Sequence, residues 1–83
     1  MENVEEKLKK ETVKWLNKIK NVRILENKDD SFLKNINAYI SDCEYFLKKN
    51  DLINAFEAVI WAWAWLEIGE RIGMLKFEIK EES

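Results

Sequence analysis

One apolar segment dominates the second half of this 83-residue chain. Residues 51–73 read DLINAFEAVIWAWAWLEIGERIG, and Ala55, Ala62 and Gly69 recur in this segment at intervals of seven. Small residues at that spacing share one side of a helix and let a neighbouring helix approach closely, while larger side chains fill the grooves between them. We therefore expect the segment to be the central helix of a small bundle, with Ala55, Ala58, Ala62 and Gly69 in its tightest seam.

The rest of the chain also favours helices, because it has no proline, only two glycines and 47% hydrophobic residues. Helical spacing of apolar residues predicts helices near 3–21, 31–49 and 52–73, with a tight turn at Asn50 and a stop at Gly73. We expect a single all-α domain over residues 1–83, folded as an antiparallel up-down-up three-helix bundle. Four aromatic side chains should be largely buried in it: Trp15, Tyr39, Trp61 and Trp65.

The tail, residues 74–83, has a different pattern, because Leu75, Phe77 and Ile79 alternate with charged residues. A period of two is typical of a strand. Two arrangements are open. The tail can pair with residues 22–26 as a small ribbon, which would bring Arg23 near Glu78, or it can pack Phe77 irregularly onto the bundle, since an isolated two-stranded ribbon is only marginally stable.

A second apolar strip follows the central helix and is a candidate protein interface. Its apolar members are Ile53, Phe56, Ile60, Trp63 and Ala64, and Glu57, Glu67 and Arg71 lie at its edges. A bundle this small has few elements to cover both sides of so apolar a helix, so we expect a homodimer or another protein partner. In a homodimer the helix would meet its mate antiparallel, with Ile60 and Trp63 near the twofold axis. A wider internal core is the alternative.

A basic stripe, Lys7, Lys10, Lys14 and Lys18, lies beside the apolar side of the first helix. Such a stripe could contact phosphates, which makes an accessory nucleic-acid-binding domain the alternative function. The net charge of −2 counts against it, because such domains are usually strongly basic. Lysine stems that shield the edge of a core are the ordinary explanation.

Catalysis is not expected. The chain has no histidine, so histidine-dependent acid–base catalysis and histidine-ligated metal sites are excluded. Its one cysteine, Cys43, falls on the apolar side of the second helix, where an inert buried thiol is the ordinary case. Glu67 with Arg71 is expected to form an ion pair one turn apart. We expect no cofactor, no metal ion and no enzymatic activity.

A cytoplasmic location is expected, because the sequence starts with Met-Glu-Asn rather than with a basic stretch followed by an apolar run. The apolar window at 52–69 approaches the length of a membrane span, but Asn54, Glu57 and Glu67 interrupt it. We therefore expect a core helix and no membrane association.

The segment from Asp42 to Gly73, DCEYFLKKNDLINAFEAVIWAWAWLEIGERIG, resembles an archaeal family catalogued as domain of unknown function 357. Members of that family likewise carry an aromatic-rich tract before a short polar turn and an alanine-rich helix. Trp61 and Ala64 differ from the tyrosine and glycine expected there. The resemblance implies a three-helix up-down-up bundle of archaeal origin, and it implies no activity, cofactor or catalytic residue.

Overall fold

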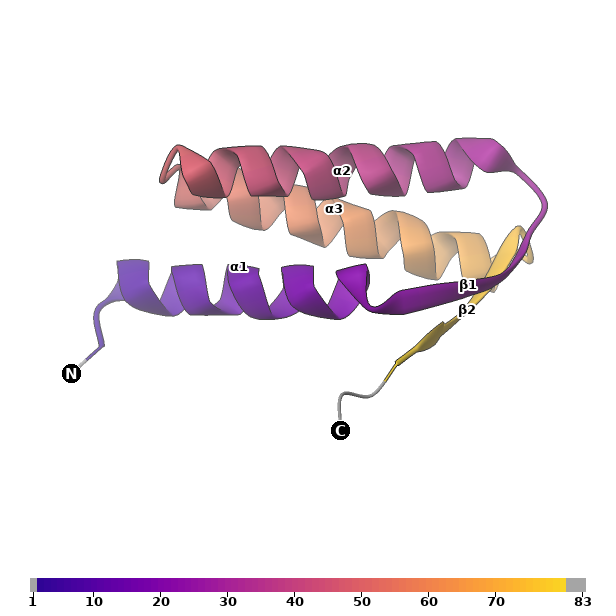
Figure 1. The fold of residues 1–83 in the computed structure, drawn as a ribbon, viewed down its shortest axis with the longest axis horizontal. Coiled ribbons are helices and arrows are strands. Elements are labelled where there is room, and N and C mark those ends of the chain that lie inside the picture. The colour runs from indigo at the N-terminus through magenta and orange to yellow at the C-terminus, as the bar shows by residue number, and fades with distance from the viewer. Residues whose placement is uncertain (1, 81–83) are drawn as a thin grey trace.

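The computed structural model of the chain describes residues 2–80 and contains three helices and two strands (Figure 1). The three predicted helices agree with the structure to within two residues at each end. Residues 81–83, the last part of the predicted tail, lie outside the described residues. In chain order the elements are α1 (Val4–Lys20), β1 (Val22–Asn27), α2 (Asp30–Lys48), α3 (Leu52–Arg71) and β2 (Leu75–Ile79).

The all-α prediction is wrong, because β1 and β2 form a two-stranded antiparallel sheet. Arg23 lies opposite Glu78 in this ribbon, and the guanidinium and carboxylate are 2.6 Å apart. The ribbon is therefore the arrangement that the tail adopts. A two-stranded sheet is only marginally stable alone, but this one is attached to the helices. Leu75, the first residue of β2, is only 1% exposed and packs within the core. The fold is mostly helical, with a small sheet at one end (Figure 1).

Caps and turns fix where the helices begin and end. The carboxylate of Asp29 accepts hydrogen bonds from the backbone N–H and the hydroxyl of Ser31, at 2.9 and 2.8 Å, and these bonds lower the pKa of Asp29. Asp51 caps α3 in a similar way. Asn50 and Gly73 have φ angles of 57° and 80°, which confirms that both predicted turns use the left-handed conformation.

The three helices are arranged with α3 in the middle (Figure 1). Helix α3 packs against both α1 and α2, whereas α1 and α2 scarcely touch each other. The third side of the helix triangle is therefore open, and the molecule is flat, with extents of 44 × 28 × 18 Å. Because α1 and α2 both lie on one side of α3, the opposite side of α3 has no neighbour among the described elements.

The small residues of α3 form the seam that the sequence predicts. Ala55 and Ala62 are completely buried and Ala58 is 5% exposed. At Gly69 an added Cβ would lie 3.0 Å from side-chain atoms of both Leu75 and Phe32, so this position joins α3, α2 and β2 at close range.

One aromatic prediction is wrong. Trp15, Tyr39 and Trp65 are half-buried, but 53% of Trp61 is exposed. The Trp61 ring stacks on Tyr39 of α2, with ring centroids 6.3 Å apart, and leaves its outer part in solvent. Trp61 therefore lies at the border between the side of α3 that contacts α2 and the side that faces solvent.

Candidate protein interface

The uncovered side of α3 carries large apolar side chains in solvent. We call this surface the outer face of α3. Five large apolar residues on it or at its end are exposed: Ile53 (69%), Ile60 (45%), Trp61 (53%), Ile68 (51%) and Ile72 (55%). Side chains three, four and seven residues apart on a helix lie on one side of it, so these residues form one surface rather than scattered exposures.

The structure divides the predicted interface residues into two groups. Ile53, Ile60, Glu67 and Arg71 are exposed on the outer face. Phe56 and Trp63 are instead half-buried, seven residues apart on the side of α3 that turns toward α1.

Trp63 is held there by α1. Its indole N–H donates a 3.1 Å hydrogen bond to the backbone carbonyl of Trp15, and the two rings meet edge to face with centroids 5.8 Å apart. A tryptophan bound in this way belongs to the internal packing of the protein, so Trp63 is not part of the exposed outer face.

Three residues of the outer face were not among the predicted interface residues: Trp61, Ile68 and Ile72. A signal for two of them was present in the sequence, since Trp61, Ala64 and Ile68 follow the spacing i, i+3, i+7. This spacing was not distinctive, because α3 has apolar residues on every side.

The charged residues of the outer face have no partners within the described chain. Glu57, Glu67 and Arg71 are exposed, and none of them forms an ion pair with another of residues 2–80. The expected pair between Glu67 and Arg71 is therefore not formed. These charges are available to groups outside the chain.

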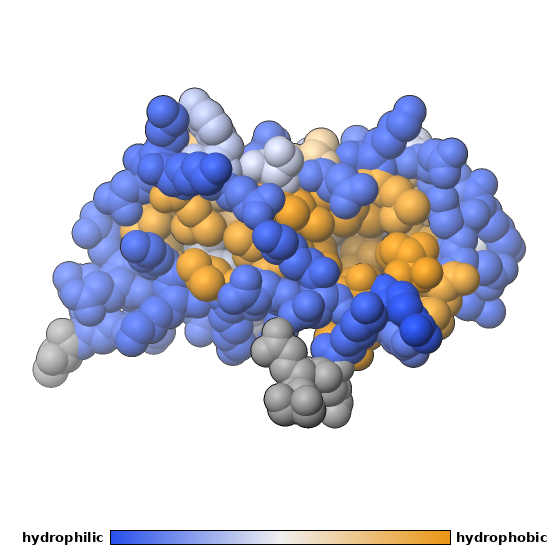
Figure 2. Space-filling view, in the orientation of Figure 1, coloured by the Kyte–Doolittle hydropathy of each residue, from blue (hydrophilic) through white to orange (hydrophobic). Residues whose placement is uncertain are grey.

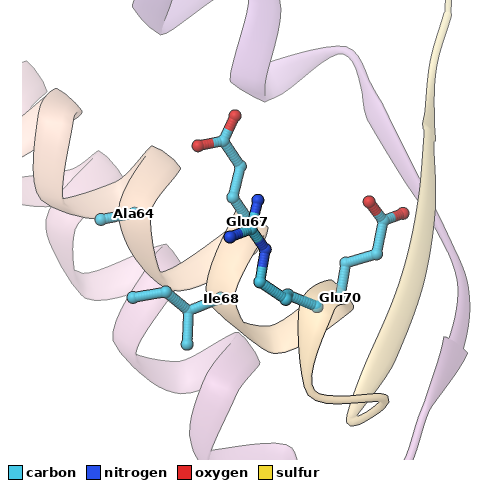
Figure 3. Close-up of a pocket in the computed structure, with 5 residues that line it drawn as sticks. Ala64, Glu67, Ile68 and Glu70 are labelled. Atoms are coloured by element: carbon cyan, nitrogen blue, oxygen red, sulfur yellow. The ribbon is translucent and has the colours of Figure 1, made fainter.

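A depression on the outer face is lined by Ala64 and Ile68 together with Glu67 and Glu70 (Figure 3). Figure 3 shows the side chains of Ala64 and Ile68 on one side of α3, whereas the carboxylates of Glu67 and Glu70 project away from them. Arg71 also lines the depression. The depression thus combines an apolar floor with a charged rim.

The opposite side of the molecule has a second apolar surface. Figure 2 shows apolar atoms in a band between α1 and α2, where these helices do not meet. A groove in this region is lined by residues of α1, β1 and α2, among them Val22, Ile24, Leu33 and Ile40. All four are half-buried, whereas the apolar residues of the outer face are roughly half exposed or more. The outer face is therefore the stronger candidate interface.

Two lysines of the basic stripe on α1 pair with neighbouring carboxylates. Lys10 pairs with Glu2, and the ammonium group of Lys14 lies 3.9 Å from the carboxylate of Glu11. These local pairs reduce the charge that the stripe presents to an anionic partner.

Two lysines of the stripe also lie over an aromatic ring. The ammonium groups of Lys18 and Lys14 are 4.6 and 5.3 Å from the centroid of the Trp15 ring. This cation–π arrangement supports the explanation that the stripe shields the edge of the core. Lys7 is the one member of the stripe without an ion pair or a cation–π contact among residues 2–80.

The side chains offer little reactive chemistry. Cys43 is completely buried, and burial, with a smaller contribution from the negative charge of Glu44, raises the pKa of its thiol to about 11. Such a thiol stays protonated at neutral pH and is a poor nucleophile. Residues 2–80 contain no group of three or more cysteine, aspartate or glutamate side chains placed to hold a metal ion.

Helix α3 is long and apolar enough to cross a membrane, judged by length and composition alone. The core helix of a soluble protein meets the same criteria, and α3 packs against α1 and α2 along its buried side. Its apolar character therefore does not decide where the protein resides.

The fold and the outer face of α3 define a small, mostly helical protein without a recognisable catalytic centre among residues 2–80. Comparison with known proteins identifies its family. A family model described as protein of unknown function, DUF357, matches residues 1–75, so the chain belongs to this family. The match includes α1 and β1, beyond the α2–α3 segment in which the sequence resemblance lies. No curated protein matches the chain.

A solved structure agrees with this assignment. The chain is 51% identical to protein AF1782 from Archaeoglobus fulgidus, whose crystal structure is described under the same family. The match covers 92% of this chain and 100% of that one, with a TM-score of 0.81. A close relative of archaeal origin therefore has the same fold.

Proposed function

We propose that this protein works by contact with another protein chain, through the outer face of α3, and that it is not an enzyme. The observation that carries the proposal is the exposure of Ile53, Ile60, Trp61 and Ile68 on one side of the most apolar helix. Aromatic and branched apolar residues gathered in solvent and bordered by charges are typical of protein interfaces. Self-association is the simplest form of such contact, and the proposal includes a cytoplasmic location.

Nucleic-acid binding through the basic stripe of α1 has less support. Lys10 and Lys14 have carboxylate neighbours and Lys18 lies over Trp15, so three of the four lysines are engaged within the chain. The chain as a whole is acidic, with a net charge of −2. A domain that neutralises phosphates usually presents an unpaired excess of positive charge.

The proposal is tested with Ile60→Lys, which places a charge in the middle of the outer face. Ile60 is 45% exposed, so the lysine can reach solvent in the separate chain, and the fold should be kept. In the contact it would be desolvated without a partner, which is costly. The matched control is Val13→Lys, which introduces the same side chain at a position that is 36% exposed on α1.

Circular dichroism and sedimentation equilibrium are measured for both variants and the unmodified chain. We expect helical spectra for all three, association of the unmodified chain and of Val13→Lys, and a monomer for Ile60→Lys. Unchanged association of Ile60→Lys, or equal loss in both variants, would overturn the assignment of the contact to the outer face.

A further inference from the structure

The outer face of α3 is arranged almost symmetrically about Ala64. Ile60 and Ile68 lie four residues before and after it, and Glu57 and Arg71 lie seven before and after it. The apolar positions are thus the same on both sides, while the charges at the two ends have opposite sign. All of these side chains except the half-buried Ala64 are exposed.

Such an arrangement is complementary to itself when two helices run antiparallel. In an antiparallel pair with a twofold axis beside one residue, positions at equal distances before and after that residue lie at the same level along the pair. With the axis at Ala64, each Glu57 lies level with Arg71 of the other copy, and each Ile60 lies level with Ile68. The small methyl groups of the two Ala64 residues allow the helices to approach closely.

Resting on the proposed contact function, we propose that the partner is a second copy of this chain, bound through antiparallel packing of the two α3 helices with the twofold axis at Ala64. Trp61 of each copy enters the depression lined by Ala64, Glu67 and Ile68 on the other, since Trp61 and Glu67 lie three residues on either side of the axis. The dimer thereby covers Trp61, the most exposed tryptophan of the protein, and pairs Glu57 and Arg71, which have no ion-pair partners among residues 2–80.

The charges select this arrangement over its alternatives. In a parallel pair Glu57 would face Glu57 and Arg71 would face Arg71, which places like charges together. An antiparallel pair with its axis at Ile60 would place Glu57 level with Trp63, which is held against α1 by the hydrogen bond to Trp15. The axis at Ala64 joins opposite charges and needs no change in the packing of α1.

Charge reversal tests the pairing. Glu57→Arg and Arg71→Glu are made separately and together, and the dissociation constant of the dimer is measured by sedimentation equilibrium. Each single reversal opposes like charges at two symmetric places, so we expect the dimer to weaken by about tenfold or more. The double variant restores two opposite pairs and should return to within about threefold of the unmodified constant. Single reversals without effect, or a double variant weaker than both single variants, would overturn the proposed register.

A cross-link tests the orientation independently. Cysteine is introduced at Ala64 in a chain that also carries Cys43→Ala, and mild oxidation should link two copies through position 64. The control is Ile53→Cys in the same background, at a position that is 69% exposed and so more accessible to oxidation than the half-buried Ala64. In the antiparallel pair the two copies of residue 53 are roughly 33 Å apart, from 22 residues at the rise of a helix, and should not link.

The outcomes separate this inference from the broader proposal. A dimer that is lost in Ile60→Lys but is indifferent to the charge reversals and links through position 53 keeps the outer face as the contact and rejects the antiparallel geometry. A chain that remains monomeric at every concentration rejects self-association altogether, and the antiparallel geometry with it.

Discussion

Trp63 of α3 donates its indole N–H to the backbone carbonyl of Trp15 on α1, across 3.1 Å. This hydrogen bond and the edge-to-face contact of the two rings join the helices that are parallel in the fold. They also set the limit of the candidate interface, because Trp63 is turned toward α1 while Trp61, two residues earlier, is turned toward solvent. One side of α3 thus packs in the core, and its other side is exposed to solvent.

The different roles of these two tryptophans lead to a prediction. In the Ile60→Lys background, which keeps the chain monomeric in this account, Trp63→Phe should lower the free energy of unfolding by about 1–2 kcal/mol, since it removes a hydrogen bond and part of the packing on Trp15. Trp61→Phe in the same background should change it by less than about 0.5 kcal/mol, because that ring is largely exposed. Urea denaturation measures both values. Equal effects would contradict the assignment of Trp63 to the core.

The alanine seam provides a second prediction. Ala62 is completely buried, so Ala62→Leu should overpack the contact between α3 and its neighbours and lower the stability of the monomeric background by about 1–3 kcal/mol. Ala64→Leu is the control, since Ala64 is half-buried and its methyl group points toward the outer face. We expect it to leave the melting temperature of the monomer nearly unchanged. An unchanged melting curve for Ala62→Leu would refute the seam.

The attachment of the ribbon can be tested at Leu75. Leu75→Ala should lower the free energy of unfolding by about 2–5 kcal/mol, because the side chain is 1% exposed and packs beside Gly69. Ile79→Ala, in the same strand but at 49% exposure, should have a much smaller effect. If both variants are as stable as the unmodified chain in a thermal melt, β2 is not anchored in the core as described.

The buried thiol predicts a dependence of stability on alkaline pH. Folding raises the pKa of Cys43 from 9.0 to about 11, so the folded state favours the protonated thiol. This contribution is fully present below the unfolded pKa and is lost as the pH rises through the folded pKa. The free energy of unfolding should therefore fall more between about pH 9 and about pH 11 in the unmodified chain than in Cys43→Ala. Parallel losses in the two chains would show that the thiol does not contribute.

The helices could be predicted from the sequence because their determinants are local. Apolar spacing defined α1, α2 and α3, and the short turn at Asn50 allowed only a reversal of direction. The sheet was harder to predict. Its stability depends on the packing of Leu75 in β2 beside Gly69 in α3. The alternating pattern of β2 does not show that this tertiary contact forms.

The outer face was only partly predictable for a related reason. In α3, apolar residues occur on every side, so periodicity alone could not show which of them the other helices cover. Trp63 is half-buried because α1 lies on its side, and Trp61 is exposed because α2 reaches only its inner edge, through Tyr39. The positions of α1 and α2 determine which apolar residues of α3 are buried. These positions follow from the tertiary packing of the three helices.

Self-association through α3 is tested by the mass of the unmodified chain in solution, measured by sedimentation equilibrium over a wide range of concentration at low and at high salt. We expect a mass of twice the 10.0 kDa of one chain, and we expect it to persist at high salt because the contact is mainly apolar. A mass of one chain under all these conditions would contradict it.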